Sequence, residues 1–244
     1  ARPPQKNKPP RVPRAKGAPV SMSNTCAIAI DGPSAAGKST IARRIAGEFG
    51  FLYVDTGALY RAIGLAAVRR GKNPKLPQEV LPILPGLELK LAYVDGVQRV
   101  FLGGEDVSEA IRTPEMSMAA SAVSAIPEVR AFLLGYQREL ARTHSVVMDG
   151  RDIGTVILPE AKVKIFLTAT PERRAARRYQ EYLQKGVPAE YDQVLKEILE
   201  RDANDISRET APLRQAEDAV LVDSSDMTLE EAVRAIKAIV RERC

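Results

Sequence analysis

Residues 32–40 have the sequence Gly32-Pro33-Ser34-Ala35-Ala36-Gly37-Lys38-Ser39-Thr40, which matches the pattern G-x-x-x-x-G-K-[ST] throughout. Glycines at both ends let the backbone curl so that its N–H groups point inward at phosphate oxygens. A helix that begins at Lys38 directs the positive end of its dipole at the same anion. Lys38 can then reach the β- and γ-phosphates, and the Ser39 hydroxyl can join a Mg²⁺ shell. We therefore expect these residues, the phosphate-binding loop, to bind a nucleoside triphosphate with Mg²⁺.

The segments around the loop predict an α/β fold. Residues 26–30 are a short apolar run, which is typical of a buried parallel strand. Residues 38–49 carry apolar side chains at helical spacing, and residues 51–54 are again short and apolar. Thr56 can cap a second helix. A strand, a helix, a strand and a helix in succession indicate a parallel sheet.

The rest of the chain continues this alternation, with one interruption. Residues 87–108 alternate apolar and charged side chains between glycines, which predicts a small antiparallel sheet inserted in the fold. The remaining predicted strands are 145–149, 163–167 and 219–222. The remaining predicted helices are 114–143 with a break near Pro127, 171–184, 190–208, and a last helix that Thr228 opens with a capping box. The sequence therefore predicts five core strands.

The net charge of +5 is concentrated at the N-terminus. Residues 1–24 hold six of the 36 basic residues and no acid, which leaves 30 basic residues against 31 acidic ones in the remainder. The same segment holds six of the 17 prolines, so we expect a disordered, solvated tail. Weak contact of this tail with a polyanion is the alternative, and we expect no other nucleic-acid binding.

Composition also suggests where the protein acts. No apolar run approaches the ~18–20 residues that cross a bilayer, and the N-terminus has no apolar stretch typical of a secretion signal. Cys26 and Cys244 are the two cysteines, so we expect no disulfide framework. These features favour the reducing cytoplasm and exclude a membrane-spanning protein.

Arginines follow several predicted strands, where an open α/β sheet binds its ligands. They lie in the segments 55–61, 149–152 and 172–178, and on the helix segment 201–208. Because arginine stays charged and binds phosphate bidentately, this distribution favours a second anionic substrate. The absence of an N-K-x-D segment argues against a GTP switch.

Some of these residues have ordinary alternatives. Arg177 and Arg178 could form a solvated helix face, and Arg201, Asp205 and Arg208 could form an intrahelical ladder of ion pairs. The acid that orders Mg²⁺ waters could be Asp149, at the end of a strand, or Asp31, directly before the loop. The sequence leaves these alternatives open.

The whole pattern resembles the bacterial cytidylate kinases of the nucleoside monophosphate kinase superfamily. The segments that carry the resemblance are 30–39, 55–62, 104–108, 111–115, 149–156 and 200–208. The resemblance covers residues 27–243. It implies a three-layer P-loop NTPase fold with a five-stranded parallel sheet and a small mobile lid at about 179–191. It also implies one kinase domain over residues 25–244, whose monophosphate-binding segment spans about 56–130 and includes the inserted sheet.

The resemblance implies phosphoryl transfer from ATP to CMP or dCMP, with Mg²⁺ held partly by Ser39. Lys38 and Arg177, with Arg173 or Arg174, would act on the ATP phosphates. The residues implied for the acceptor are Arg61, Arg151 and Arg208 for its phosphate, Ser121, Arg130 and Asp152 for cytosine, Arg201 and Asp205 for the sugar, and Thr56 and Tyr60 for the pocket wall.

The alternatives are a kinase for another monophosphate, such as UMP or AMP, and a nucleotide-binding regulator without catalysis. A panel of acceptors would separate the first, and the absence of acceptor-dependent transfer would indicate the second. No pattern in the sequence indicates a seam between subunits, so we expect a monomer.

Overall fold

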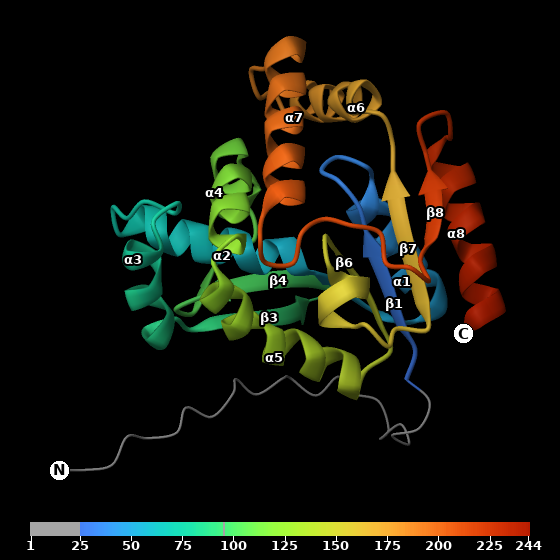
Figure 1. Ribbon diagram of the computed structural model, residues 1–244, viewed down its shortest axis with the longest axis horizontal. Coiled ribbons are helices and arrows are strands. Elements are labelled where there is room, and N and C mark those ends of the chain that lie inside the picture. Colours follow the sequence, from blue (N-terminus) through green and yellow to red (C-terminus); the bar gives the residue numbers. More distant parts are fainter. Residues whose placement is uncertain (1–24, 95) are drawn as a thin grey trace.

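The structure is a computed structural model that describes residues 25–94 and 96–244 (Figure 1). The tail predicted over residues 1–24 lies outside the described residues. The described part contains a five-stranded sheet and a separate three-stranded one. The first is entirely parallel, in the order β2-β6-β1-β7-β8.

The five strands of the large sheet are β1 (Ala27–Asp31), β2 (Leu52–Asp55), β6 (Val146–Gly150), β7 (Val163–Thr168) and β8 (Val220–Asp223). The prediction of a five-stranded parallel sheet is confirmed. β1 lies at its centre, where Ile28 and Ile30 are fully buried. The inner strands are short apolar runs because helices cover both faces.

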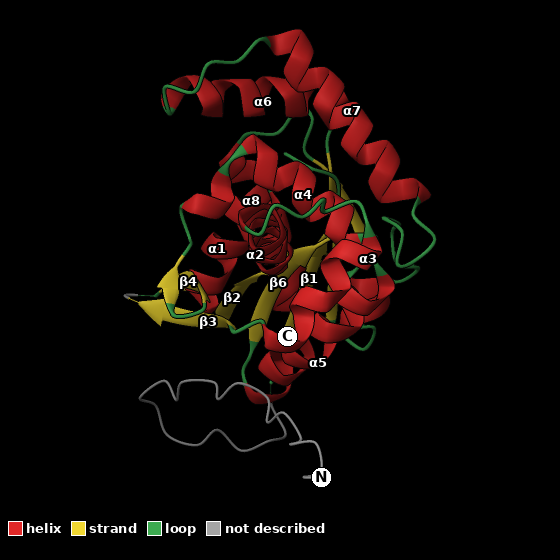
Figure 2. Ribbon diagram, turned by 90° about the vertical axis from the view of Figure 1, so that its left-hand side faces the viewer, coloured by secondary structure: helices red, strands yellow, loops and turns green. Residues whose placement is uncertain are grey.

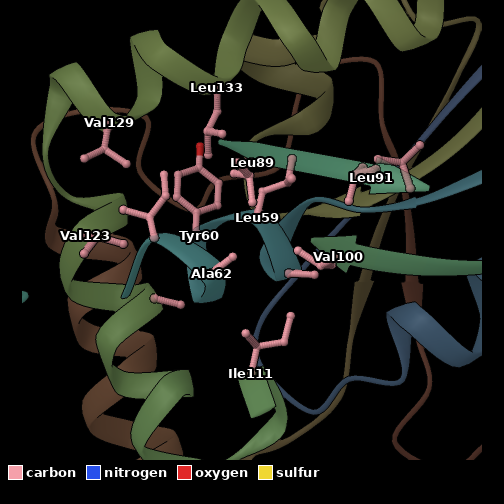
Figure 3. Packing of buried hydrophobic residues seen from close by; sticks show 14 of the residues in the cluster. Leu59, Tyr60, Ala62, Leu89, Leu91, Val100, Ile111, Val123, Val129 and Leu133 are labelled. Atoms are coloured by element: carbon pink, nitrogen blue, oxygen red, sulfur yellow. The ribbon is translucent and has the colours of Figure 1, made fainter. Parts of the chain in front are cut away.

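Helices on the two faces give the predicted three layers. On one face α1 (Lys38–Phe49) and α8 (Leu229–Arg243) pack against Ile28, Ile30 and Ile165. On the other, α2 (Thr56–Arg69), α4 (Pro114–Ser124) and α5 (Pro127–Thr143) form a second core with the small sheet (Figure 3). The predicted break at Pro127 is confirmed, since α4 and α5 are bent by 98° to each other.

The small antiparallel sheet lies where the sequence predicts it. Its strands are β3 (Leu89–Val94), β4 (Val97–Leu102) and β5 (Glu105–Asp106). Leu91 and Val100 face the second core beside Leu59 and Tyr60 of α2 (Figure 3). Two short helices, α3 (Pro77–Val80) and the 3-10 helix η1 (Leu81–Gly86), precede it and were not predicted, because prolines obscure their spacing.

Two helices extend beyond the carboxyl ends of the strands. α6 (Pro171–Gln184) and α7 (Tyr191–Ser207) lie together at one end of the molecule (Figures 1 and 2). Their contact is a small cluster of Ala175, Val194 and Ile198. The bounds of both helices agree with the prediction. The short segment 185–190 joins them at the outer end.

Three expectations need correction. Thr56 does not cap α2, because the Asp55 carboxylate accepts the Ala58 N–H and Thr56 is the first helical residue. A π-helix, η3 (Ile153–Ile157), follows β6 where no helix was expected. Cys26 and Cys244 form a disulfide with Cα atoms 6.3 Å apart, because α8 ends beside the start of β1. No sequence pattern indicates this contact, since 218 residues separate the cysteines.

Within the described ranges, no single helix is long and apolar enough to cross a membrane. α4 and α5 meet that criterion only as a bent pair, by length and composition.

Candidate functional site

The phosphate-binding loop joins β1 to α1 in the predicted way. Gly32 has φ 147° and Gly37 has φ 93°, values that glycine adopts without strain. A Cβ atom at Gly32 would lie 1.9 Å from the Leu167 carbonyl oxygen, so no side chain fits there. Lys38 is 6% exposed, and its Nζ donates to the Pro33 carbonyl at 2.6 Å. Burial and the nearby Arg151 lower the pKa of Lys38 by more than the Asp149 carboxylate raises it.

Of the two acids left open by the sequence, Asp149 lies beside the loop hydroxyl. Its Oδ2 accepts a hydrogen bond from Ser39 Oγ at 2.7 Å. The Asp31 carboxylate instead accepts the N–H groups of Ile153 and Gly154 at 2.8 and 2.7 Å, and it thereby anchors η3. Burial raises the pKa of Asp149, and it raises that of Asp31 to about 7. The oxygen atoms next to Ser39 therefore belong to Asp149.

One cavity of about 560 Å³ follows the carboxyl edge of the sheet. It brings together nearly all of the residues predicted for the site, including Lys38 and the arginines predicted for the acceptor phosphate. The predicted residues that line it are Ser34, Ala35, Ala36, Gly37, Lys38, Ser39, Thr40, Thr56, Tyr60, Arg61, Ser121, Arg130, Arg151, Asp152, Arg177, Arg201, Asp205 and Arg208. Gly32 and Pro33 shape the loop from beneath without lining the cavity.

A buried polar pocket forms one end of the cavity. The Arg130 guanidinium makes an ion pair with Asp152, and its carbon lies 5.5 Å from the centre of the Tyr60 ring. Arg130 Nη1 also donates to the Ser124 carbonyl at 3.2 Å. Ser121 lies one turn before Ser124 on α4 and faces the same cavity. Arg130 thus holds Asp152, Tyr60 and α4 together in this pocket.

Cationic side chains with free donors lie between this pocket and the loop. Four buried guanidinium nitrogens have no hydrogen-bond partner among the described residues, namely Arg61 Nη1, Arg178 Nε, Arg201 Nε and Arg208 Nη2. Arg151 Nε donates a hydrogen bond to Asp205 Oδ2 at 2.7 Å. Burial and Arg151 lower the pKa of Arg201 to about 9. Three of these four nitrogens, on Arg61, Arg178 and Arg208, lie 3.6–3.7 Å from carboxylate oxygens of Asp55, Glu181 and Asp152, too far for a hydrogen bond. Buried donors whose hydrogen bonds are not made are suited to bind a polyanion.

The arginines of α6 have different surroundings. Arg174 is buried, donates hydrogen bonds to the carbonyls of Ser34 and Ala169, and makes an ion pair with Asp202. Through the bond to Ser34 it stabilises the phosphate-binding loop. Arg177 donates to Ser224 Oγ at 3.1 Å and to the Ser224 carbonyl at 2.5 Å. Arg178 also lines the cavity, and its Nε lies 3.7 Å from Glu181 Oε2 without a hydrogen bond. Burial is the main cause that lowers the pKa values of Arg61 and Arg201, and the charge of Arg178 lowers them further.

The comparisons with known proteins identify the family. The family model described as cytidylate kinase matches residues 28–242. The chain belongs to the cytidylate kinase family. A cytidylate kinase from Caldicellulosiruptor bescii is 52% identical over 86% of this chain and 92% of its own length. Another, from Syntrophotalea carbinolica, is 46% identical over 91% of this chain and 94% of its own length.

A solved shikimate kinase from Bacteroides thetaiotaomicron aligns with 88% of this member of the cytidylate kinase family and 98% of its own chain. Its identity is 13% and its TM-score is 0.44, so it adds nothing to the family assignment.

Some residues of this cytidylate kinase family site escaped the sequence analysis. Ser224 and Met227, between β8 and α8, and Leu229, the first residue of α8, also line the cavity. Arg112 also lines the cavity and donates to Asp55 Oδ2 at 2.9 Å. The only sequence signal for Ser224–Leu229 is its place after the last predicted strand, where ligand-binding loops are expected. Arg112 lies in the segment 111–115 that carries the family resemblance, and Arg178 in the charged segment 172–178, but nothing in the sequence separates either from its neighbours.

Proposed function

We propose that this chain catalyses transfer of the terminal phosphoryl group of ATP to CMP and dCMP, which yields ADP and CDP or dCDP. The observation that carries the proposal is the group of buried guanidinium nitrogens without hydrogen bonds, together with the Arg130–Asp152 pocket in the cavity that Lys38 also lines. A donor and an acceptor that meet there would bring their phosphates against these donors. The names of the relatives favour cytidylate over the UMP, AMP and regulator alternatives.

The donor half of the cavity fits a Mg²⁺–ATP complex. Ser39 and Asp149 supply the hard oxygen atoms that Mg²⁺ prefers, and Mg²⁺ would be held by Ser39 directly and by Asp149 through water. The bound ion neutralises charge on the phosphates. Lys38 lies next to the same oxygens and contacts the β- and γ-phosphates in this assignment. The adenosine then extends towards Met227 and Leu229, whose exposed apolar side chains suit a base.

The acceptor half suits cytosine. The Asp152 carboxylate accepts a hydrogen bond from the exocyclic amine of cytosine, whereas uracil would place a carbonyl oxygen against it. Ser121 and Arg130 contact the remaining polar edge, and Tyr60 and Thr56 form the wall. Arg61, Arg151 and Arg208 bind the acceptor phosphate, and Arg201 and Asp205 lie where the sugar meets it.

The acceptor nucleophile is already a phosphate oxygen, so transfer needs no strong general base. Catalysis then consists of alignment and charge neutralisation in a site without water. Lys38, Arg151 and Arg208 contact the reacting groups from below, and Arg177 and Arg178 of α6 contact them from above. Closure of the lid, about 179–191, excludes water that would otherwise hydrolyse ATP. Opening of this lid then limits turnover.

We also propose that the enzyme acts as a monomer, since no pattern in the sequence indicates a seam between subunits. The deciding experiment is a coupled assay of ADP release with CMP, dCMP, UMP and AMP side by side. We expect transfer to CMP and dCMP at rates well above those for UMP and AMP. Faster transfer to UMP or AMP would replace the proposed acceptor. ATP binding without acceptor-dependent transfer would indicate a regulator.

Two variants connect the assay to the site. We expect Lys38→Ala to lose ~10³-fold or more in turnover, because one oriented charge on the transferring group is lost. We expect Asp152→Ala to narrow the preference for CMP over UMP, since the acceptor for the cytosine amine is removed. Asp218→Asn is the control, because Asp218 pairs with Lys164 away from the cavity and should change neither quantity.

A further inference from the structure

Tyr53 lies behind residues that line the cavity. Its hydroxyl donates to Asp149 Oδ1 at 2.9 Å, on the carboxylate whose other oxygen accepts from Ser39. Tyr53 does not itself line the cavity. Tyr53 is thus linked to the cavity by Asp149 through its hydroxyl and by Arg43 through its ring.

Both oxygens of Asp149 are held, and this fixes the plane of the carboxylate. The terminal torsion of an aspartate is broad, so a single hydrogen bond from Ser39 would leave the group free to rotate. The second bond, from Tyr53, removes that freedom. Asp149 is 4% exposed, so bulk water cannot substitute for the lost donor.

Two contacts hold Tyr53 itself, and a third holds the end of its strand. The Arg43 guanidinium carbon lies 5.6 Å from the centre of its ring. The Tyr93 hydroxyl of β3 donates to the Tyr53 carbonyl at 2.9 Å. Two residues further along β2, the Asp55 N–H donates to Gln98 Oε1 of β4 at 2.9 Å. The small sheet thus fixes the end of the strand that carries Tyr53.

We propose that Tyr53 is a positioning residue for the donor site, because it orients Asp149 and, through Asp149, the Ser39 hydroxyl. This inference rests on the proposed binding of Mg²⁺–nucleotide at the phosphate-binding loop. The inference also assigns a role in the donor site to the small sheet, which belongs to the acceptor segment. Tyr93 and Gln98 of this sheet bind the backbone of β2 and so position Tyr53 beside Asp149.

Calorimetric binding of ADP, with and without Mg²⁺, tests the inference on the full chain. Tyr53→Phe keeps the ring and its contact with Arg43 but removes the hydroxyl. We expect its affinity for ADP in Mg²⁺ to fall roughly 3- to 10-fold, the range of one buried hydrogen bond. We expect its affinities for ADP without Mg²⁺ and for CMP to stay within about twofold. An equal loss with and without Mg²⁺, or no loss at all, overturns the inference.

A double-mutant cycle then tests the path through Asp149. In an Asp149→Asn background, Tyr53→Phe should change the Mg²⁺-dependent affinity no further, whereas an additive loss contradicts the path. Tyr136→Phe is the matched control, because Tyr136 accepts the Leu91 N–H away from the cavity and should leave the Mg²⁺ dependence unchanged. Should Tyr53→Phe fail to fold, Tyr93→Phe provides the same readout, with a smaller loss expected.

Failure of this inference is distinguishable from failure of the proposed function. If the wild-type chain does not phosphorylate CMP or dCMP, the proposed function is wrong. If wild-type transfer is intact and Tyr53→Phe binds ADP normally in Mg²⁺, only the role of Tyr53 is wrong.

Discussion

At the scale of single residues, burial and hydrogen bonding have opposite effects on the pKa of Asp31. Its carboxylate accepts two backbone N–H groups, which favour the charged form, yet burial outweighs them and raises its pKa from 3.8 to about 7. Between these two values the folded chain holds a proton that the unfolded chain has released. The protonated Asp31 side chain therefore contributes to the free energy of unfolding at low pH, and this contribution is lost as the pH rises towards 7.

The variant Asp31→Asn removes this titration. We expect the wild-type advantage over the variant in free energy of unfolding to shrink by roughly 2–3 kcal/mol between pH 5 and pH 7, since each unit is worth about 1.4 kcal/mol. Urea denaturation without nucleotide measures it. An advantage that grows with pH would mean that the two N–H groups keep Asp31 ionised.

At the scale of elements, two adjacent arginines of α6 should behave in opposite ways. Arg174→Met leaves the Asp202 carboxylate without its cation and frees the Ser34 carbonyl, so we expect a loss of about 3–5 kcal/mol in stability. The Arg173 side chain is 60% exposed and pairs only with Asp226, so Arg173→Met should cost no more than ~0.5 kcal/mol. Chemical denaturation compares the two, and equal losses would contradict the anchoring role of Arg174.

The packing of α2 on α4 gives a second prediction at this scale. A Cβ atom at Gly64 would lie 2.8 Å from Ala119 Cβ, so Gly64→Ala must push α4 away, at about 1–3 kcal/mol. Because α4 carries Ser121, we also expect a higher KM for CMP and an unchanged KM for ATP. Gly135→Ala in α5 meets no atom within 4 Å and should stabilise the protein by roughly 0.5–1 kcal/mol. A neutral Gly64→Ala would show that α4 shifts freely.

The elements differ in how far their sequences predicted them. β1, the phosphate-binding loop and α1 were predicted closely, because periodicity, glycine positions and the start at Lys38 all agree. η3 was missed, because its geometry depends on a hydrogen bond from the Ile153 N–H to the Asp31 carboxylate. Asp31 lies 122 residues before Ile153. The choice between Asp31 and Asp149 was open for the same reason. Local patterns predict an element, but the partner of a buried carboxylate depends on which strands are neighbours.

At the scale of the whole molecule, the parallel sheet brings the site together. β6 lies between β1 and β2, so the carboxyl ends of these three strands are neighbours. They carry the phosphate-binding loop after β1, Arg151 after β6 and Thr56 after β2, although about 120 residues separate the loop from Arg151. The sequence could predict that these ends meet at one edge of the sheet. It could not predict that Arg177 donates to Ser224, because this contact arises from the tertiary position of α6.

The covalent link between the two ends of the described chain gives the last prediction. A disulfide that spans 218 residues restricts the unfolded chain, so we expect Cys244→Ser to lower stability by about 2–4 kcal/mol. With excess dithiothreitol the wild-type chain should lose this advantage. Cys244 is exposed, so the serine itself is tolerated. Two titratable thiols in the folded, unreduced protein would contradict the link. We expect the rate of phosphoryl transfer at 25 °C to be unchanged, because β6 and β7 hold β1 on both sides with or without it.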